Sequence, residues 1–247
     1  RYCAPHWIEE VLADPDRYLT DSSCLVSNSP LVTMGRIARQ DSVGPTLLLR
    51  RLNYGRIRHR LRDIFRQTRA ERAFWHGIGL EEAAVATPKV LAVGVQRFWR
   101  WPVRAYLITE WVPNASTVRD VLDRERRLPR ELVYRLADLL ARLHEHGFSH
   151  RDLNLSNVLL DKSLRPILID LDGVRQIGWP NTRRARADLT RFAWEFVQYP
   201  LFLKWHGWRF LKRYGERRHL ETAWRGLGAE IARLIRRRLA AGKTGWK

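Results

Sequence analysis

One segment of the 247-residue chain reads His150-Arg151-Asp152-Leu153-Asn154-Leu155-Ser156-Asn157. Directly before it, residues 130–146 repeat leucine at helical spacing on one face, and Gly147 is a suitable residue to end that helix. Directly after it comes the short apolar run Val158-Leu159-Leu160, which predicts a strand. The segment is therefore predicted to be a polar loop between an amphipathic helix and a short strand.

The spacing within this loop predicts phosphoryl-transfer chemistry. The loop matches every specified position of H-R-D-L-x-x-x-N, the catalytic-loop signature of protein kinases. Phosphoryl transfer needs a carboxylate that positions the acceptor, and oxygen ligands that hold Mg²⁺ against the nucleotide phosphates. Asp152 supplies the first and Asn157 supplies part of the second.

A second metal-binding element is predicted at Leu168-Ile169-Asp170-Leu171-Asp172-Gly173. The apolar run that starts at Pro166 ends at Ile169, so Asp170 is the first polar group beyond a buried strand. Its spacing from Asn157 also fits the short hairpin that separates the two metal motifs of kinases. We expect Asp170 to be the principal Mg²⁺ ligand and Asp172 an auxiliary group. Two alternatives remain: a register that starts at Asp172, and a turn that Asp170 merely caps.

The residues that would bind the nucleotide follow the kinase pattern less closely. The chain contains no G-x-G-x-x-G loop, and Gly35 is the only glycine in the two predicted strands of the hairpin. Arg50 stands where the phosphate-binding lysine is expected; it offers a permanent cation and fork donors, but it is bulkier. Glu71 is the acid placed to be its carboxylate partner on the following helix. It can equally be a solvated helix residue paired with a neighbouring arginine.

A hinge is predicted at Leu107-Ile108-Thr109-Glu110-Trp111-Val112-Pro113, where the pattern changes from strand to helix. There the carbonyl of Glu110 and the amide of Val112 would meet the edge of adenine.

Residues 1–30 look irregular, and the N-terminal half then reads as strands at 31–53 (around a turn at 41–45), 90–95 and 105–109, with a helix at 56–77. After the hinge come helix 130–146, strands 158–160 and 166–169, and helical residues from Thr182.

This order predicts an α+β, bilobal protein-kinase-like fold. The N-terminal lobe, residues 1–110, is β-rich with one main helix and would cover the nucleotide. The C-terminal lobe, residues 111–247, is α-helical and would carry the catalytic loop, the metal and the acceptor site.

The composition is strongly basic: 45 Lys and Arg against 26 Asp and Glu give a formal charge of +19. Such a charge attracts polyanions, namely nucleic acid, anionic lipid head groups or phosphorylated glycans.

Cys3 and Cys24 have no metal-ligand spacing, and a reducing compartment is the simpler reading of a single possible pair. The sequence contains no run of about 18 apolar residues, the length that could span a bilayer.

Several strings together resemble the bacterial lipopolysaccharide core kinases, which phosphorylate heptose or Kdo sugars of the inner core. They are Leu49-Arg50-Arg51-Leu52-Asn53, Thr68-Arg69-Ala70, Thr87-Pro88 and Tyr106-Leu107-Ile108-Thr109-Glu110, joined to the two metal motifs. The resemblance covers roughly residues 45–175. It implies a kinase-like fold, ATP with Mg²⁺ as the phosphate donor, and work at the cytoplasmic face of the inner membrane. It also implies Asp152 as catalytic base and Asn157 and Asp170 as Mg²⁺ ligands.

The main departure from the family pattern is Arg50, where the family has lysine followed by arginine. This departure supports an alternative: a pseudokinase, or a kinase-like protein that acts on or binds another anionic partner. The absence of an A-P-E element argues against a protein kinase. The intact set of Asp152, Asn157 and Asp170 favours an active enzyme.

The expected partner is lipopolysaccharide core or another anionic acceptor, with peripheral contact to an anionic membrane. Arg56–Arg62, with Arg66 and Arg69, forms a candidate acceptor-binding patch or simply a solvated helix face. The aromatic and basic residues at 194–213 suit either an interfacial anchor or the core of a helical lobe, and Arg233–Arg238 either a lipid contact or an exposed helix end. Nucleic acid is not favoured, because no RNA-binding module signature is present.

Overall fold

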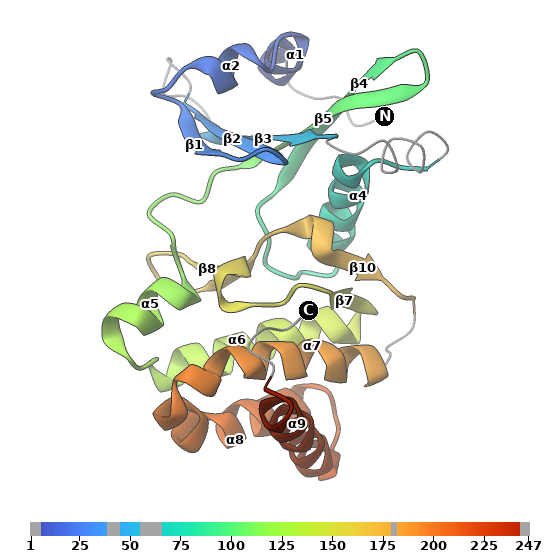
Figure 1. Ribbon diagram of the computed structural model, residues 1–247. Coiled ribbons are helices and arrows are strands. Elements are labelled where there is room, and N and C mark those ends of the chain that lie inside the picture. The colour runs from blue at the N-terminus through green and yellow to red at the C-terminus, as the bar shows by residue number, and fades with distance from the viewer. Residues whose placement is uncertain (1–5, 39–44, 55–65, 179–181, 243–247) are drawn as a thin grey trace. The chain divides into compact units, whose positions relative to one another are not determined.

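The computed structural model describes residues 6–38, 45–54, 66–178 and 182–242 (Figure 1). The chain forms two compact units, Arg1–Gly79 with Pro88–Val112 and Leu80–Thr87 with Pro113–Lys247. The sequence division at 110/111 differs from this one mainly at Leu80–Thr87, a segment that no sequence pattern assigned to the second unit.

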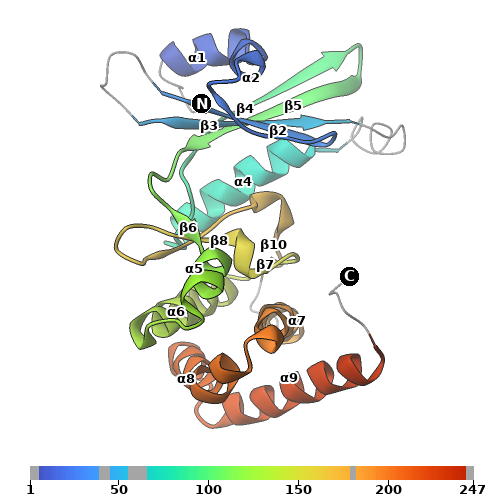
Figure 2. The ribbon, with the colours of Figure 1, turned by 60° about the vertical axis from the view of Figure 1, so that its left-hand side comes forward.

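The first unit is built on a five-stranded antiparallel sheet in the order β1-β2-β3-β5-β4. The strands are β1 (Leu25–Asn28), β2 (Val32–Ile37), β3 (Leu47–Asn53), β4 (Val90–Phe98) and β5 (Trp101–Glu110). Helices α1 (His6–Ala13) and α2 (Arg17–Thr20) lie on one face of the sheet, and α4 (Arg69–Glu82) lies along the other (Figure 2). Ile8, Val11 and Leu19 pack against Leu47 and Leu49 of β3 to form the core. For residues 6–28 the expectation of irregular structure is therefore wrong, because apolar side chains of α1 and α2 cover a sheet face.

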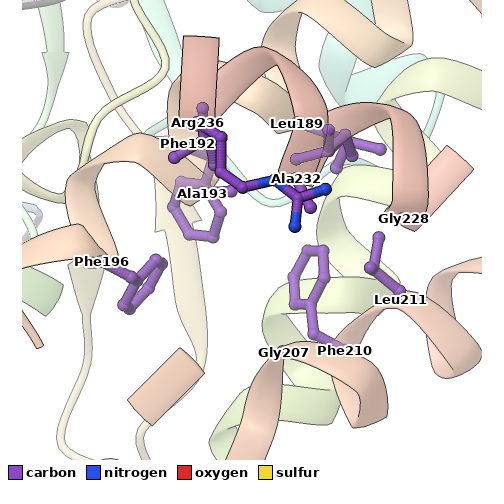
Figure 3. A pocket seen from close by; sticks show the side chains of 12 residues that line it. Leu189, Phe192, Ala193, Phe196, Gly207, Phe210, Leu211, Gly228, Ala232 and Arg236 are labelled. Atoms are coloured by element: carbon purple, nitrogen blue, oxygen red, sulfur yellow. The ribbon is translucent and has the colours of Figure 1, made fainter. Parts of the chain in front are cut away.

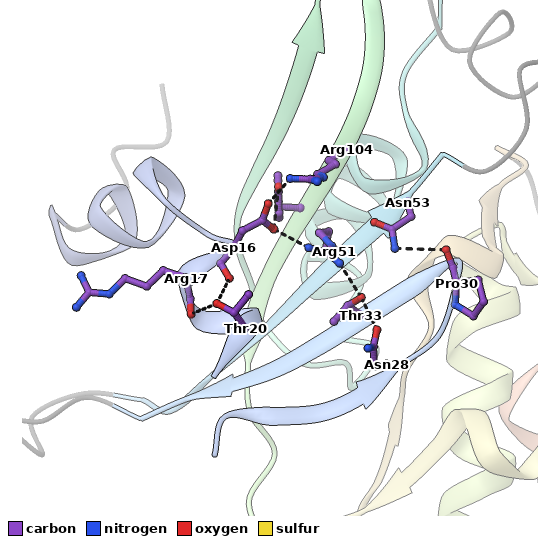
Figure 4. Close-up of polar contacts among 10 residues, drawn as sticks. Asp16, Arg17, Thr20, Asn28, Pro30, Thr33, Arg51, Asn53 and Arg104 are labelled. Carbon is purple, nitrogen blue, oxygen red and sulfur yellow. Dashed lines mark hydrogen bonds and ion pairs between the residues drawn. The ribbon is translucent and has the colours of Figure 1, made fainter. Parts of the chain in front are cut away.

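Asp16 ties the start of α2 to the sheet (Figure 4). Its Oδ1 accepts hydrogen bonds from Arg51 at 2.9 Å and from the Tyr106 hydroxyl at 3.2 Å, and its Oδ2 accepts one from Arg104. Successive side chains of a strand alternate between its faces, so Arg51 belongs to the α1/α2 face and Arg50 to the α4 face. The two adjacent arginines of β3 therefore serve opposite sides of the sheet.

The second unit is mainly helical. Its helices are α5 (Val118–Glu125), α6 (Arg130–Glu145), α7 (Thr182–Glu195), α8 (Pro200–Arg217) and α9 (Ala223–Ala240). Two small sheets hold the loops: β6 (Ser116–Thr117), β8 (Val158–Leu160) and β9 (Pro166–Leu168) form one, and β7 (Phe148–His150) pairs with β10 (Val174–Gln176) in the other. Short 3₁₀ turns lie at η1 (Leu155–Asn157), η2 (Leu171–Gly173) and η3 (Phe196–Gln198). The leucines predicted to line one face of residues 130–146 are buried in α6.

The long helix of the first half differs from its prediction. It spans Arg69–Glu82 instead of 56–77, and residues 55–65 lie outside the described part of the chain. Thr68 explains where it starts: its hydroxyl accepts from the Glu71 amide at 3.2 Å, while the Glu71 carboxylate accepts from the Thr68 amide at 2.6 Å. This reciprocal pair is a capping box, and the string Thr68-Arg69-Ala70-Glu71 carries its sequence signature. The apolar spacing suggested a helix, but the cap determines its first residue.

Candidate active site

His150 fixes the start of the catalytic loop. Its side chain is fully buried, its Nδ1 accepts from the Asp152 amide at 3.3 Å, and its Nε2 lies 3.1 Å from the Ile169 carbonyl oxygen. Since a backbone amide can only donate and a carbonyl can only accept, the imidazole is neutral with its proton on Nε2. A Cβ at Gly173 would lie 3.0 Å from Cε1 of His150, so a larger residue there would crowd the ring. The imidazole thereby joins the loop that carries Asp152 to the end of the strand that precedes Asp170.

Asn157 and Asp170 are brought together by backbone pairing. Strands β8 and β9 pair from Val158 with Leu168, and the Ile169 amide extends the pairing by donating to the Asn157 carbonyl at 2.9 Å. Asp170 follows at once. The Asn157 side chain donates through Nδ2 to the Asp152 carbonyl at 2.7 Å, so Oδ1 is the atom that could coordinate a metal ion. The three predicted catalytic and metal residues are therefore linked within the second unit.

Asn154, an unspecified position of the signature, shapes the loop. Its Oδ1 accepts from the backbone amides of Ser156 and Asn157, each at 3.0 Å, and so caps η1. An asparagine side chain is well suited to this local turn. The cap sets the direction in which Asn157 leaves the backbone.

Asp170 has a left-handed backbone, with φ 61° and ψ 55°. Outside glycine this conformation costs about 1 kcal/mol or more, and it persists where the surroundings enforce it. Here the β8–β9 pairing holds one side, while the Gly173 amide donates to the Asp170 carbonyl at 2.9 Å and the Arg151 amide to the Gly173 carbonyl at 3.0 Å on the other. Asp170 lies directly at the strand end and Asp172 one turn later, in η2, which favours the register that starts at Asp170.

The ligand chemistry of this pair fits Mg²⁺. The amide oxygen of Asn157 and the carboxylate of Asp170 are hard oxygen donors. Mg²⁺ is typically held by one or two such groups, with substrate phosphates and waters completing its shell. Among the described residues no group of three or more His, Cys, Asp and Glu could hold a metal ion by itself. A site of this kind would therefore be completed by the nucleotide phosphates.

Asp188 of α7 is a residue of this site that the sequence analysis missed. Its side chain is 2% exposed, and its Oδ2 accepts from the His150 amide at 2.8 Å and from the Ser149 hydroxyl at 2.7 Å. Nε2 of His144 lies 3.4 Å from the same oxygen. Asp188 thus holds β7, which leads into the catalytic loop, onto the helices beneath. The signal was weak: a lone acid on an otherwise apolar face of residues 182–195, with no motif around it.

Two further groups extend this buried polar network. The Tyr214 hydroxyl lies 2.9 Å from Nδ1 of His144, and burial raises the pKa of that hydroxyl. Burial also lowers the pKa of Arg191, which lies 3.6 Å from Asp188, although the carboxylates of Asp188 and Asp152 act in the opposite direction. Arg191 is therefore a half-buried cation close enough to Asp152 for the two charges to interact.

Leu80–Thr87 joins the second unit through hydrogen bonds to β9. The Leu168 amide donates to the Ala86 carbonyl at 2.8 Å, and the Thr87 hydroxyl donates to the Leu168 carbonyl at 3.0 Å. The Arg142 guanidinium donates to the Ala84 carbonyl at 2.9 Å. The end of α4 thus connects directly to the strand that leads into Asp170.

The predicted nucleotide residues all lie in the first unit. Arg50 is on β3, paired in register with Met34 and Leu107, and Glu110 ends β5, where its amide donates to the Lys89 carbonyl at 2.9 Å. Val112 is the last residue of the unit. The carboxylate of Glu71 closes the capping box of α4 and lies 4.0 Å from Arg97 of β4.

Gly35 has a packing role. It lies inside β2, where a Cβ would approach the Leu19 side chain to 2.9 Å and the Tyr18 carbonyl oxygen to 3.1 Å. Its missing side chain allows α2 to pack closely on the sheet. This contact explains the glycine without a phosphate-binding loop.

A cavity of about 330 Å³ lies among the helices of the second unit (Figure 3). Phe192, Phe196, Phe210, Ile231 and Ile235 supply apolar walls, and Arg236 is the charged residue of the lining. The lining residues come from α7, η3, α8 and α9, so none belongs to the catalytic loop. The cavity is suited to an apolar ligand or chain.

The aromatics at 194–213 divide between two environments. Trp194, Phe196 and Phe210 are buried, whereas Trp208 is 52% exposed. The candidate patch Arg56–Arg62 lies outside the described residues, apart from its companions Arg66 and Arg69. Cys24 is a free thiol, and Cys3 is also outside the described part. Within the described ranges, no helix combines the length and apolarity that a membrane crossing requires.

Comparison with known proteins gives a family and a fold. The sequence profile of the Lipopolysaccharide kinase (Kdo/WaaP) family matches residues 33–214. A 3-deoxy-D-manno-octulosonic acid kinase of Vibrio parahaemolyticus is 30% identical over 110 residues, 44% of this chain and 45% of that protein. One of Actinobacillus succinogenes is 34% identical over 83 residues, 34% of each chain. The chain thus spans less than half the length of these curated relatives.

A solved structure, "WaaP in complex with acyl carrier protein", matches with a TM-score of 0.68 at 19% identity, over 96% of this chain and 98% of that one. This likeness confirms the predicted fold class, α+β and kinase-like.

Proposed function

Because the chain belongs to the Lipopolysaccharide kinase (Kdo/WaaP) family, we propose that it transfers a phosphoryl group from ATP to a sugar hydroxyl of the lipopolysaccharide inner core. Kdo is the first candidate acceptor and heptose the second, since the curated relatives are named as kinases of 3-deoxy-D-manno-octulosonic acid. The observation that carries the proposal is the linkage of Asp152, Asn157 and Asp170 through the Asn157 side chain and the β8–β9 pairing.

Each residue of this set has a proposed role. Asp152 orients the acceptor hydroxyl and accepts its proton as the acceptor oxygen bonds to the γ-phosphorus and the bond from that phosphorus to the leaving oxygen of ADP breaks. Asn157 and Asp170 would hold Mg²⁺, which neutralises charge on the phosphates during transfer. His150 and Asp188 position the loop through hydrogen bonds and do not touch substrate. Arg191 is the cation whose charge interacts with that of Asp152.

On the nucleotide side the proposal assigns four residues. Arg50 supplies a permanent cation to the phosphates, and Glu110 and Val112 offer a backbone carbonyl and amide to adenine. Glu71 contributes indirectly, by fixing the first turn of α4 through the capping box. The alternative, a pseudokinase that binds an anionic partner, rests on arginine in place of lysine at position 50.

Two partners follow from the same proposal. The charge of +19 suits work at an anionic membrane, with the protein peripheral on the cytoplasmic face of the inner membrane. An acyl carrier protein is a second candidate, since the solved WaaP structure contains one by its title, and the apolar cavity of α7–α9 could accept an acyl chain. Its test is a thermal shift with acylated and unacylated carrier protein: stabilisation by the acylated form alone supports it, and equal effects refute it.

The kinase proposal is tested by incubating the purified protein with Mg²⁺, labelled ATP and Kdo or heptose acceptors in parallel. Wild type should label one of them, and Asp152→Ala should lower kcat by about 10³-fold or more, since it removes both acceptor positioning and proton transfer. Because Asp152 is exposed, the melting temperature should not change. Labelling that survives Asp152→Ala would overturn the mechanism. Wild type that neither transfers phosphate nor binds nucleotide would establish the pseudokinase.

A further inference from the structure

The tip of the β4–β5 hairpin exposes three aromatic side chains. β4 ends at Phe98 and β5 begins at Trp101, so Trp99 and Arg100 form the turn. We call residues 98–101 the aromatic tip. Phe98 is 71% exposed, Trp99 89% and Trp101 38%, and in the described part of the chain no other large apolar side chain is as exposed as Trp99. Apolar surface of this kind, gathered at one point, is typical of an interaction site.

The aromatic tip lies beyond the rest of the sheet. β3 pairs with β5 only from Leu47 to Asn53, opposite Glu110 to Arg104, and a register shift between Gln96 and Arg97 interrupts the hairpin just before the tip. Figure 1 shows the hairpin reaching past the ends of β2 and β3. The aromatic side chains therefore lie outside the sheet core, which is formed farther along by residues such as Ala92 and Ile108.

The backbone of the turn argues that folding does not require tryptophan there. Trp99 has φ 56°, a left-handed conformation. Two-residue hairpin turns with positive φ at the first central position select glycine, asparagine or aspartate, because a bulky side chain is strained there. An exposed tryptophan in such a turn costs folding free energy without burying its own surface. A function outside the fold accounts for it better.

The charge around the aromatic tip is positive. The hairpin from Val90 to Thr109 contains no acidic residue, whereas Arg97, Arg100 and Arg104 near its turn are all basic. Acids from packed elements offset part of this charge: Asp16 pairs with Arg104, and Glu71 lies 4.0 Å from Arg97. Arg100 is exposed beside Trp99, at the extremity of the hairpin.

We propose that the aromatic tip inserts into the head-group region of a bilayer that contains anionic phospholipid. Tryptophan prefers the membrane–water interface because its ring is apolar and its N–H needs a polar partner, and arginine beside it attracts anionic head groups. A protein partner fits less well, because four residues cover far less than the 20–30 residues a side of a stable interface. The inference rests on the proposed function in one respect: it names the element by which such a kinase would meet the membrane.

The test is co-sedimentation of the full chain with vesicles of phosphatidylethanolamine and phosphatidylglycerol, and with vesicles of phosphatidylcholine alone. Wild type should bind the anionic vesicles and release them as salt rises.

The double variant Phe98→Ser/Trp99→Gly should lower the partition coefficient roughly tenfold, since two large aromatic contacts are lost. Trp99→Gly alone should keep or raise the melting temperature, because glycine removes the left-handed strain. Arg100→Glu should lower binding about fivefold or more, and only on anionic vesicles.

Trp75→Ser is the matched control, since Trp75 of α4 is 57% exposed and lies outside the tip; it should bind as wild type. Trp208→Ser tests the rival anchor on α8 and should also bind as wild type. The proposal is overturned if the double variant retains full binding, if either single control loses as much binding as the double variant, or if wild type ignores anionic vesicles. Sedimentation requires neither ATP nor acceptor, so Asp152→Ala should bind vesicles normally. A failure of the kinase proposal would therefore leave this result unchanged.

Discussion

The catalytic region of the second unit and the nucleotide region of the first are held in different ways. In the catalytic region, Asp152, Asn157 and Asp170 are placed by backbone pairing, a buried imidazole and a buried carboxylate. In the nucleotide region, strand alternation puts Arg50 on the α4 face of the sheet, and the carboxylate of Glu71 is engaged by its own helix end. A site fixed by backbone hydrogen bonds tolerates little change in its framework, whereas a site built from long side chains can exchange them.

This difference leads to a hypothesis about which positions can be substituted during evolution without loss of phosphoryl transfer. Arginine for lysine at position 50 changes the shape of a flexible side chain and keeps its charge. A change of Asp170 would remove both the proposed metal ligand and one of the few residue types that accept its backbone conformation. The three predictions below compare the two regions directly.

The largest effect is expected at Asp170. Asp170→Asn should lower kcat by about 10³-fold, because a metal-ligating charge is lost, while the melting temperature stays the same, because asparagine also tolerates a left-handed backbone. Steady-state kinetics over a Mg²⁺ titration, with thermal melts in parallel, measure both quantities. Asp172→Asn is the matched control and should change kcat by less than about tenfold. If Asp172→Asn proves the more damaging of the two, the register is wrong and the metal strand must be reassigned.

A smaller effect, mainly on the free energy of unfolding, is expected when Asp188 is replaced. Asp188→Ala leaves the His150 amide, the Ser149 hydroxyl and His144 without their buried acceptor, which should cost about 3 kcal/mol of unfolding free energy. Denaturant unfolding measures this cost. Ser149→Ala removes one of those donors together with its bond and should cost only about 1 kcal/mol.

Measuring phosphoryl transfer in the same variants distinguishes a role of Asp188 in positioning the catalytic loop from a role in stability alone. At a temperature where Asp188→Ala is still folded, its kcat should fall while KM for ATP is kept, because the loop that carries Asp152 loosens. If the folded fraction of Asp188→Ala transfers phosphate at the wild-type rate, Asp188 supports the fold only and does not position the catalytic loop.

The sequence could predict that Asp152, Asn157 and Asp170 act together because their signal is local. The loop and the following strand supply their roles within 21 residues, from His150 to Asp170, and the structure links them through short-range pairing. It could not predict Asp188, since one carboxylate 38 residues beyond His150 becomes significant only when α7 packs under β7. The burial of Asp188, not its sequence context, identifies it.

Elsewhere the sequence predicted types of element better than their ends or partners. Most strands and the core helix α6 lie within a few residues of their predicted positions, because period-2 and helical spacing survive folding. The start of α4 was missed, although Thr68 and Glu71 carry a readable cap. The N-terminal helices were missed because prolines and turn formers outweighed the short apolar spacing of Trp7, Ile8 and Val11. Gly35 was read as a weak loop signal, and only its distance to Leu19 reveals the packing role.

The smallest effect, and the sharpest test of the contrast between the two regions, concerns Glu71. Glu71→Ala removes the reciprocal half of the capping box and should cost about 1 kcal/mol of unfolding free energy. Glu71→Gln keeps an oxygen that can accept from the Thr68 amide, so it should cost much less, and KM for ATP should stay within about twofold of wild type.

Arg50→Ala, by contrast, should raise KM for ATP about tenfold with little change in stability, and Arg50→Lys should restore it, since a single cation at the phosphates is what matters. A tenfold rise of KM in Glu71→Gln would contradict the capping role and assign the carboxylate to the nucleotide site itself. In that case the nucleotide region would be as tightly specified as the catalytic one, and the tolerance inferred for position 50 would have to be explained by something other than loose construction.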